Sequence, residues 1–285
     1  MIETPGREAI AEAWSDSCPN AKKTQWVWES YSQKMVDELG SYDNVFYVYK
    51  DERSYETGPW KDNMTGHMLA FFRRRGATVL VDWEARRKDV DAIVVATHAV
   101  DKNSLAERAF TQAPARPVVM LKSTPYTLGD PEVRIFMWTF AMGGGHFFFH
   151  DDERQGTSKT GIMGYDPTVD GGVKPLLTYD WLGYLSHFFN HVVSELDDMA
   201  PHNELIAAVR AYCVANPGNA YACYLPRDGT IALETSSDPG QATVTWYDPR
   251  TGKLAGAEGS FKVGAKGLEC TAPSEEDWVL LVRMK

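Results

Sequence analysis

The sequence predicts the fold class α/β plus β: a parallel α/β domain followed by a small antiparallel β-sandwich. Short apolar segments alternate with amphipathic segments of helical periodicity as far as about residue 196. Beyond residue 210 the helical pattern stops, and short strand-like segments are separated by turn sequences. Strands that are apolar on both faces must be covered by helices, so the first part should hold a parallel sheet, open or closed into a barrel. We therefore expect two domains, residues 1–206 and 207–285.

The expected elements of the first domain follow one another in regular alternation. A helix is predicted over residues 24–39, because apolar side chains recur at helical spacing and Gly40 follows as a stop signal. The next expected elements are a strand at 44–49, a helix at 60–75, strands at 77–81 and 92–97, a helix around 105–110, a strand at 118–121, a helix at 132–142 and a strand at 143–150. A polar, glycine-rich loop at 151–174 then precedes a helix at about 181–196, and we expect this long loop at the rim of the sheet.

The second domain is expected to contain only strands. They are predicted at residues 212–215, 220–225, 230–234, 243–247, 260–263, 268–271 and 278–282. Turn sequences rich in Pro, Gly, Asn and Asp separate several of them, as at 216–218, 227–229 and 248–252. Short strands in close succession without a helix are typical of a small antiparallel sandwich.

The composition excludes several classes of partner. The chain carries 39 acidic and 29 basic residues, which give a formal net charge of −10. Nucleic acid and anionic membranes would be approached against like charge, so neither is an expected partner. No run approaches the roughly 20 apolar residues of a membrane span, and the N-terminal residues lack the apolar core of a signal peptide. As written, the chain is expected to be soluble and cytoplasmic.

The four cysteines, Cys18, Cys213, Cys223 and Cys270, have no metal-ligand spacing and are too sparse for a disulfide framework. Cys213 and Cys223 lie on successive predicted strands and could meet. Buried free thiols are favoured over a disulfide for this pair.

A carboxylate follows the first apolar strand. Glu52 lies just beyond the strand at 44–49, and parallel α/β folds assemble their chemistry at the C-terminal ends of strands. A hydrophobic surround would raise the pKa of Glu52 and suit it to general acid catalysis. The alternative is a solvated loop carboxylate paired with Lys50 or Arg53. The strand at 118–121 ends instead in Lys122 and Ser123, although a glycosidase with two catalytic carboxylates needs a second one.

Polar residues also end the other predicted strands of the first domain. These residues are Asp82, Glu84, His98 and Asp151. His146 and His150 would face the same side of a strand, as paired metal ligands do, but a third ligand is missing and we expect neither a metal nor a cofactor. Three tryptophans could stack on sugar rings, although core packing is their commoner role: Trp83, Trp138 and Trp181.

Two regions of the chain resemble one known family. The β-sandwich labelled a putative collagen-binding domain is resembled by residues 221–229, 245–252 (Thr-Trp-Tyr-Asp-Pro-Arg-Thr-Gly), 272–273 and 277–281. That module follows the catalytic barrel in apiosidase-like glycoside hydrolases. Upstream, residues 25–27, residues 44–47 and Asp51-Glu52 are similar to the helix, the fourth barrel strand and the Asn-Glu acid/base motif of that group, with Asp51 in place of Asn.

The resemblance implies a partial or degenerate (β/α) TIM-like barrel before the sandwich, with strands that correspond to the fourth to eighth. It identifies Glu52 as the general acid/base, and it puts Lys122 or Ser123 at the nucleophile position, where neither can form a glycosyl ester. Polar residues at the barrel mouth would contact the sugar: Asp51, Asp82, Glu84, His98, Lys122 and Asp151. In an inverting mechanism, a carboxylate near Asp151 would activate water roughly 6.5–9.5 Å from Glu52, instead of the roughly 5 Å of retaining enzymes.

The resemblance therefore implies a glycoside-hydrolase-like protein that hydrolyses or binds carbohydrate. An alternative is a non-catalytic relative, or pseudoenzyme, that binds carbohydrate or protein. Another is a fragment of a longer glycosidase, since an eight-stranded barrel usually takes roughly 250 residues by itself. The expected partner is an oligo- or polysaccharide. A second copy of the chain could pair with an open sheet edge and so complete the sheet.

Overall fold

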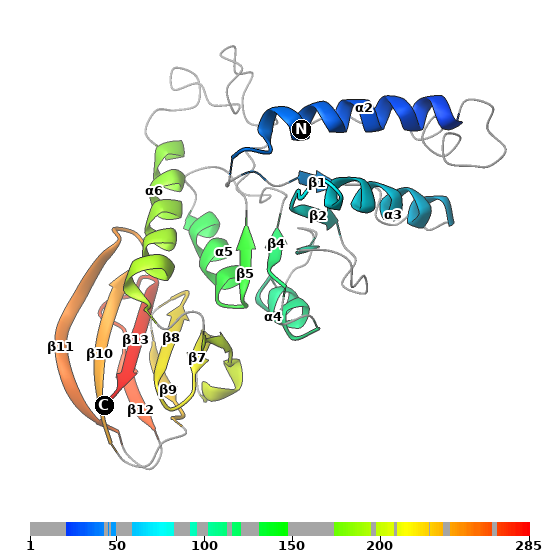
Figure 1. The fold of residues 1–285 in the computed structure, drawn as a ribbon. Coiled ribbons are helices and arrows are strands. Elements are labelled where there is room, and N and C mark those ends of the chain that lie inside the picture. Colours follow the sequence, from blue (N-terminus) through cyan, green and yellow to red (C-terminus); the bar gives the residue numbers. More distant parts are fainter. Residues whose placement is uncertain are drawn as a thin grey trace. The chain divides into compact units, whose positions relative to one another are not determined.

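A computed structural model describes residues 21–42, 45, 47–49, 59–82, 92–95, 102–112, 116–120, 131–147, 174–194, 198–207, 210–227, 229–235, 240–263 and 267–285. The chain divides into two compact units, Met1–Val94 and Val95–Lys285. Figure 1 traces the helices and strands of each unit along the sequence.

The first unit packs helices and parallel strands around one apolar cluster. Its elements are α2 (Ala21–Leu39), β1 (Tyr47–Tyr49), α3 (Pro59–Arg73), β2 (Val79–Asp82) and the start of β3 (Ile93–Val95). Strand β2 pairs in parallel with both β1 and β3. The cluster draws on both helices and on β1 and β2: Val36, Tyr47, Met68, Leu69, Phe71, Phe72 and Val79.

Helix α3 buries one face and ends at a glycine. The buried residues recur at the spacing that shares a helix face: Met68, Leu69, Phe71 and Phe72. The backbone N–H of Gly76 donates to the carbonyl of Arg73 at 3.0 Å, and Gly76 has φ of 69°. Glycine adopts this left-handed conformation at little steric cost, so it is suited to end the helix. The predicted helix at 60–75 and its stop signal are confirmed.

The second unit begins with alternating helices and parallel strands. Its first elements are α4 (Lys102–Gln112), β4 (Val118–Met120), α5 (Pro131–Ala141), β5 (Gly145–Phe147) and α6 (Lys174–His187), which continues into the π-helix η2 (Phe188–Val192). Strands β4 and β5 pair in parallel, with Val119 opposite His146. All residues of β4 are buried, as expected for a strand covered on both faces.

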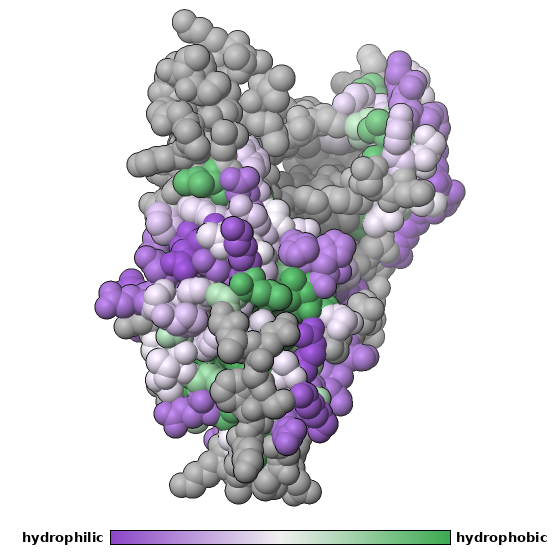
Figure 2. Space-filling view, turned by 90° about the vertical axis from the view of Figure 1, so that its left-hand side faces the viewer, coloured by the Kyte–Doolittle hydropathy of each residue, from purple (hydrophilic) through white to green (hydrophobic). Residues whose placement is uncertain are grey.

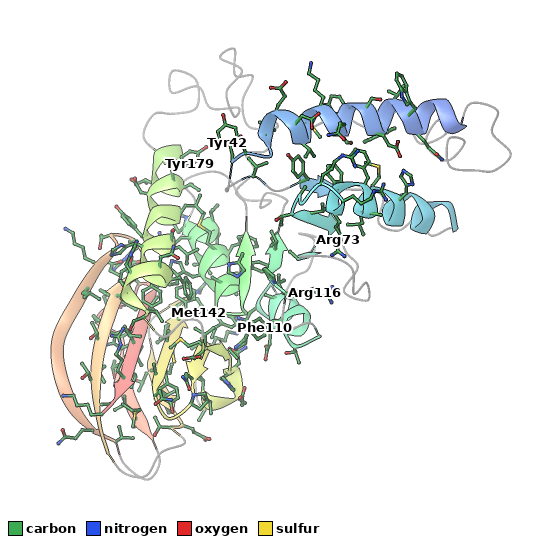
Figure 3. All side chains as sticks on the ribbon, in the orientation of Figure 1. Tyr42, Arg73, Phe110, Arg116, Met142 and Tyr179 are labelled. Atoms are coloured by element: carbon green, nitrogen blue, oxygen red, sulfur yellow. The ribbon has the colours of Figure 1, made fainter. Side chains whose placement is uncertain are left out.

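The glycines before β5 have a packing role. A Cβ atom at Gly144 would lie 2.7 Å from the ring of Phe110 in α4, and Gly144 has φ of 78°. Figure 3 labels Phe110 and Met142 in this region, where α4 meets the end of α5. The glycines at the start of the predicted strand 143–150 thus allow a close approach of backbone to side chains.

The rest of the second unit is a β-sandwich. Its elements are β6 (Ala200–Pro201), the 3₁₀-helix η4 (Asn203–Leu205), β7 (Tyr212–Asn216), β8 (Ala220–Leu225), β9 (Thr230–Leu233), β10 (Gly240–Asp248), β11 (Lys253–Val263), β12 (Leu268–Thr271) and β13 (Trp278–Met284). The strands form a six-stranded sheet in the order β11-β10-β13-β8-β7-β6 and a two-stranded sheet of β12 and β9. Their pairings are antiparallel, which confirms the predicted sandwich.

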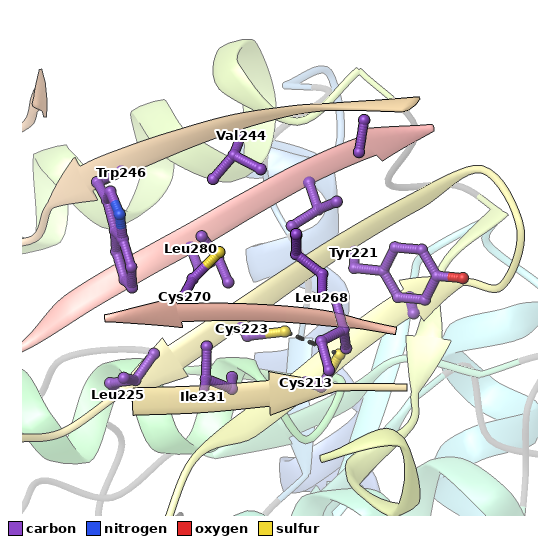
Figure 4. Packing of buried hydrophobic residues seen from close by; sticks show 14 of the residues in the cluster. Cys213, Tyr221, Cys223, Leu225, Ile231, Val244, Trp246, Leu268, Cys270 and Leu280 are labelled. Carbon is purple, nitrogen blue, oxygen red and sulfur yellow. Dashed lines mark hydrogen bonds between the residues drawn. The ribbon is translucent and has the colours of Figure 1, made fainter. Parts of the chain in front are cut away.

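The sandwich core lies between its two sheets. Alternate residues of β8 and β13, such as Cys223 and Leu280, face Ile231 of β9 and Cys270 of β12 (Figure 4). The intervening residues of β8 and β13 face the opposite side of the large sheet, because side chains alternate along a strand. Every residue of β8 is nevertheless buried, so both faces of the large sheet are covered at this strand.

The observed elements refine the predicted ones. The parallel pairing expected in the α/β part is confirmed for the described strands, and those strands do not close into a barrel. The helix predicted at 181–196 starts earlier, at Lys174, and its last turn is the π-helix that ends at Val192. Residues 151–173 of the predicted rim loop lie outside the described residues.

Figure 2 shows a surface on which hydrophilic side chains predominate over the described part, with hydrophobic ones in smaller groups. Several large hydrophobic side chains are exposed on or next to α2: Trp26, Val27, Tyr31, Leu39 and Tyr42. None of the described helices combines the length and apolar character needed to cross a bilayer.

Candidate functional site

The parallel register of the first unit brings strand ends together at one sheet edge. Tyr49, the last residue of β1, pairs with Val81, and Asp82, the last residue of β2, pairs with Val94. Parallel strands present their C-terminal ends at the same edge, where α/β proteins usually bind ligands. The predicted position of Asp82 at a strand end is confirmed for its backbone.

The other predicted residues of this edge lie outside the described part of the chain: Asp51, Glu52, Glu84 and His98. Their assignment as catalytic or sugar-contacting groups remains a prediction. In the sequence, Asp51 and Glu52 follow β1, Glu84 follows β2 and His98 follows β3. These are the strands whose parallel pairing has just been described.

A second pair of parallel strand ends occurs in the second unit. Met120 and Phe147 are the last residues of β4 and β5 and lie opposite each other. Lys122 and Asp151 follow these strands in the sequence, and both lie outside the described residues. His146 of β5 has an exposed side chain, and the described residues contain no group of three or more His, Cys, Asp or Glu that could hold a metal ion.

Two of the three candidate tryptophans are core residues. Trp138 of α5 is fully buried, and Trp181 of α6 is 5% exposed. Neither presents a free ring face to a sugar, which confirms core packing, the role favoured for them from the sequence. Trp83 lies outside the described residues.

Trp138 instead joins helix α5 to the large sheet. Its ring stacks on Tyr224 of β8, with 5.7 Å between centroids, and meets Phe188 of η2 and Tyr247 of β10 at 5.1 and 5.9 Å. The hydroxyl of Tyr247 donates to the carbonyl of Tyr184 in α6 at 2.8 Å. The sheet face opposite the sandwich core is therefore packed against helices of the same unit.

A buried ion pair fixes this junction. Arg134 of α5 donates from Nε and Nη2 to the carboxylate of Asp277, at 2.9 and 2.7 Å. The Tyr224 hydroxyl donates to the same carboxylate at 3.1 Å, and the Arg134 guanidinium lies 4.6 Å from the ring centroid of Trp181. The Arg134 and Asp277 side chains are only 6% and 2% exposed. Bidentate geometry and a third hydrogen bond offset much of the cost of burying both charges.

Burial shifts the acidity of the tyrosines around this junction. Desolvation, reinforced by the neighbouring Asp277 carboxylate, raises the pKa of Tyr224 well above its ordinary value. Burial raises the pKa of Tyr247 to about 12, with smaller contributions from Tyr184 and Asp248. Both hydroxyls therefore stay protonated and act as hydrogen-bond donors at neutral pH.

The sequence prediction missed this junction. The only charged residue between Val133 and Ala141, Arg134, was the available signal, since an arginine in such a helix is seldom buried without a partner. Its partner, Asp277, is 143 residues away in the sequence, so no local pattern connects the two.

Comparisons with known proteins bear on the fold. Residues 201–283 match the family model described as "Putative collagen-binding domain of a collagenase". No curated protein matches the sequence at a significant level. The family match covers most of the sandwich, and it agrees with the module that the sequence resembles.

Solved structures match over nearly the whole chain. A glycoside hydrolase family 5 protein from Bacteroides vulgatus has 16% identity and a TM-score of 0.68, over 90% of this chain and 66% of its own. A structure described as a glycoside hydrolase has 14% identity and a TM-score of 0.65, over 90% and 68%. A putative glycoside hydrolase from Bacteroides vulgatus has 10% identity and a TM-score of 0.62, over 90% and 55%.

The chain thus shares its fold with these three glycoside hydrolases. It spans between 55% and 68% of the length of these three proteins. At such low identity the likeness concerns the fold alone. The more specific apiosidase-like resemblance remains a prediction from sequence.

Proposed function

We propose that this chain acts on carbohydrate at the C-terminal ends of its parallel strands, with Glu52 as general acid/base of glycosidic bond hydrolysis. The parallel register of β1, β2 and β3 is the observation that carries the proposal, because it aligns the strand ends that lead to the candidate residues. The fold shared with glycoside hydrolases supports the same reading. In the first unit the proposed sugar contacts are Asp51, Asp82 and Glu84. The sequence also predicts sugar contacts at His98, Lys122 and Asp151, which belong to the second unit.

The short distance in sequence between each strand end and its carboxylate supports a common site in the first unit. Glu52 is three residues beyond Tyr49, and Glu84 is two beyond Asp82. An extended chain spans at most about 3.6 Å per residue, so these connections reach no further than about 11 and 7 Å from the strand ends. Neighbouring strands are about 4.8 Å apart. A single sugar-binding site can therefore draw on all three carboxylates.

A non-catalytic relative is the second candidate function, and one observation favours it. Strand β4 ends at Met120, and the residues that follow are Leu121, Lys122 and Ser123, none of which is a carboxylate. A retaining glycosidase needs a second carboxylate as nucleophile. A chain without that group would bind carbohydrate without cleaving it.

We propose a bracing role for the sandwich, taken as residues 207–285. The matched family is described as collagen-binding, which makes collagen a partner to test. In this chain one face of the large sheet packs on β9 and β12, and Tyr224 and Tyr247 on the other face pack on Trp138 and Phe188. Because both faces of the large sheet are covered by the chain itself, they are better suited to supporting neighbouring elements than to binding another molecule.

The test compares wild type with Glu52→Gln on a panel of oligo- and polysaccharides, with denatured collagen added as a protein ligand. Released reducing ends report hydrolysis, and isothermal titration calorimetry reports binding. Glu269→Gln is the matched control, because Glu269 is an exposed carboxylate on β12 of the sandwich. We expect Glu52→Gln to abolish hydrolysis while leaving the fold intact, and Glu269→Gln to keep wild-type turnover.

The outcomes separate the candidate functions. Hydrolysis that survives Glu52→Gln would remove Glu52 from the mechanism. Carbohydrate binding without hydrolysis by wild type would favour the non-catalytic relative. A wild-type chain that neither binds nor cleaves any carbohydrate of the panel would overturn the proposed function.

A further inference from the structure

Two thiols meet inside the sandwich core. Cys213 of β7 and Cys223 of β8 lie directly opposite each other, and their sulfur atoms are 3.3 Å apart. Both side chains are fully buried, and both are free thiols. Figure 4 shows the contact, with the thiol of Cys270 in the same core. Nothing in the proposed carbohydrate chemistry uses these residues.

The backbone hydrogen bonds define the geometry of this pair. The N–H of Cys213 donates to Oδ1 of Asn203 at 2.9 Å, and its carbonyl accepts from the N–H of His202 at 2.8 Å. Both backbone groups of Cys213 therefore point away from β8, so the two cysteines form a non-hydrogen-bonded pair. In such pairs the Cα atoms are about 4.5 Å apart and the side chains are closest. A disulfide accepts Cα separations from about 4.4 to 6.8 Å, so this pair lies within the range, at its short end.

We propose that Cys213 and Cys223 form a site of oxidative cross-linking, at which an intrachain disulfide closes the β7–β8 hairpin. The oxidant is a low-molecular-weight disulfide such as oxidised glutathione. One cysteine thiolate attacks the oxidant and releases one glutathione, and the second thiolate then displaces the other glutathione. Overall, two protein thiols and one oxidised glutathione give one protein disulfide and two molecules of reduced glutathione.

Burial decides when this reaction takes place. A buried thiol in apolar surroundings reacts slowly, because the thiolate is the nucleophile and burial disfavours it. Contact with Cys213 and desolvation both raise the pKa of the Cys223 thiol. The cross-link therefore forms while the hairpin folds, and a sandwich that folds under reducing conditions stays in the dithiol form.

The choice of partner follows from the sheet arrangement. Cys270 lies on β12, in the small sheet, whereas Cys213 and Cys223 are neighbours within the large sheet. A bond to Cys270 would join the two sheets, and we expect the bond within the hairpin instead. Cys18, the remaining cysteine of the sequence, is expected to stay a thiol.

The test refolds the full chain from urea, once in reduced glutathione and once in a mixture of reduced and oxidised glutathione. Free thiols are then alkylated under denaturing conditions, and peptides are mapped by mass spectrometry. In the oxidising buffer we expect a peptide linked through Cys213 and Cys223, with Cys18 and Cys270 alkylated. Four alkylated cysteines, or a link between any other two, would overturn the proposal.

Variants and stability give a second readout. Cys270→Ala should keep the link, whereas Cys213→Ala should leave Cys223 alkylated. Closing a short hairpin loop should raise the melting temperature of the linked chain by about 5 °C over the reduced chain. A linked chain without such a rise would show that the bond forms only at the expense of the native sandwich, and would contradict the proposal. Peptide mapping of the wild-type chain tests the proposed disulfide even if a variant does not fold.

Discussion

At the scale of single residues, we expect the buried ion pair of Arg134 and Asp277 to matter most for the stability of the second unit. Asp277 accepts hydrogen bonds from Arg134 and from Tyr224, and both charged side chains are nearly inaccessible to solvent. Replacing one partner leaves the other charge buried without compensation. Removing either partner should therefore destabilise the fold by much more than the intact pair stabilises it.

We predict that Asp277→Asn lowers the free energy of unfolding by about 3–5 kcal/mol. The measurement is urea denaturation of the full chain followed by fluorescence. Glu276→Gln is the neighbouring control: its carboxylate is 60% exposed and lies 3.8 Å from Arg250, and its loss should be worth less than about 1 kcal/mol. Equal effects of the two substitutions would show that burial of the ion pair does not govern its importance.

The residue scale is also where the sequence is least informative. Glu52 and Asp82 could be proposed because they end apolar strands, which is a local pattern. Trp138 and Trp181 could be assigned to core or site only once their neighbours were known, because an indole suits both. The pairing of Arg134 with Asp277 depends on how two distant segments pack, which no spacing in the sequence reveals.

At the scale of elements, turns and glycines set the contacts between helix and sheet. Gly252, in the turn between β10 and β11, has φ of 69°, and a Cβ atom there would collide with the ring of Tyr184 in α6. Gly76, at the end of α3, has the same φ of 69°, but a Cβ atom there would meet nothing within 4 Å. The two glycines share a backbone conformation and differ in the space around them.

We predict that Gly252→Ala destabilises the chain by about 3 kcal/mol, since it adds a steric clash to the strain of the left-handed conformation. Gly76→Ala should lower the free energy of unfolding by only about 1–2 kcal/mol, the cost of the left-handed backbone conformation for alanine. Thermal unfolding of both variants, followed by circular dichroism, makes the comparison. A Gly252 variant no less stable than the Gly76 variant would mean that Tyr184 moves aside without cost.

The predicted boundaries of two elements, β11 and α6, differ from the observed ones. Strand β11 runs from Lys253 to Val263, but only its last residues were predicted, because Gly256 and Gly259 are unusual in strands. Its long antiparallel pairing with β10 determines its extent. The start of α6 at Lys174 was missed as well, although Pro175 in its first turn is a recognised start signal.

At the scale of the whole molecule, the chain divides at Val94 into two compact units with separate apolar clusters. One cluster joins α2, α3, β1 and β2, and the other fills the sandwich. Sequence alternation was enough to predict the parallel strands and the sandwich. It could not predict this division, because residues on both sides of Val94 follow the same strand and helix pattern.

We predict two unfolding transitions in the full chain. Leu69→Ala, in the first unit, and Leu280→Ala, in the second, each remove a buried leucine that is no more than 2% exposed. Each should lower the stability of its own unit by about 2–5 kcal/mol. Hydrogen exchange read at peptides from α3 and from β13 across a urea series measures the two units separately. A substitution that shifts both transitions together would show that the chain unfolds as one unit.

The separation of Arg134 and Asp277 in the sequence has a consequence for synthesis on the ribosome. Helix α5 is translated 143 residues before the aspartate that neutralises its arginine. At 5–20 residues per second, the interval is about 7–30 s. Throughout that time the guanidinium lacks the carboxylate of Asp277, which directly precedes β13, so the apolar face of α5 cannot reach its final burial. The second unit therefore completes its core only after translation has passed Asp277, and during that interval the nascent chain depends on solvent or on chaperones to cover this helix.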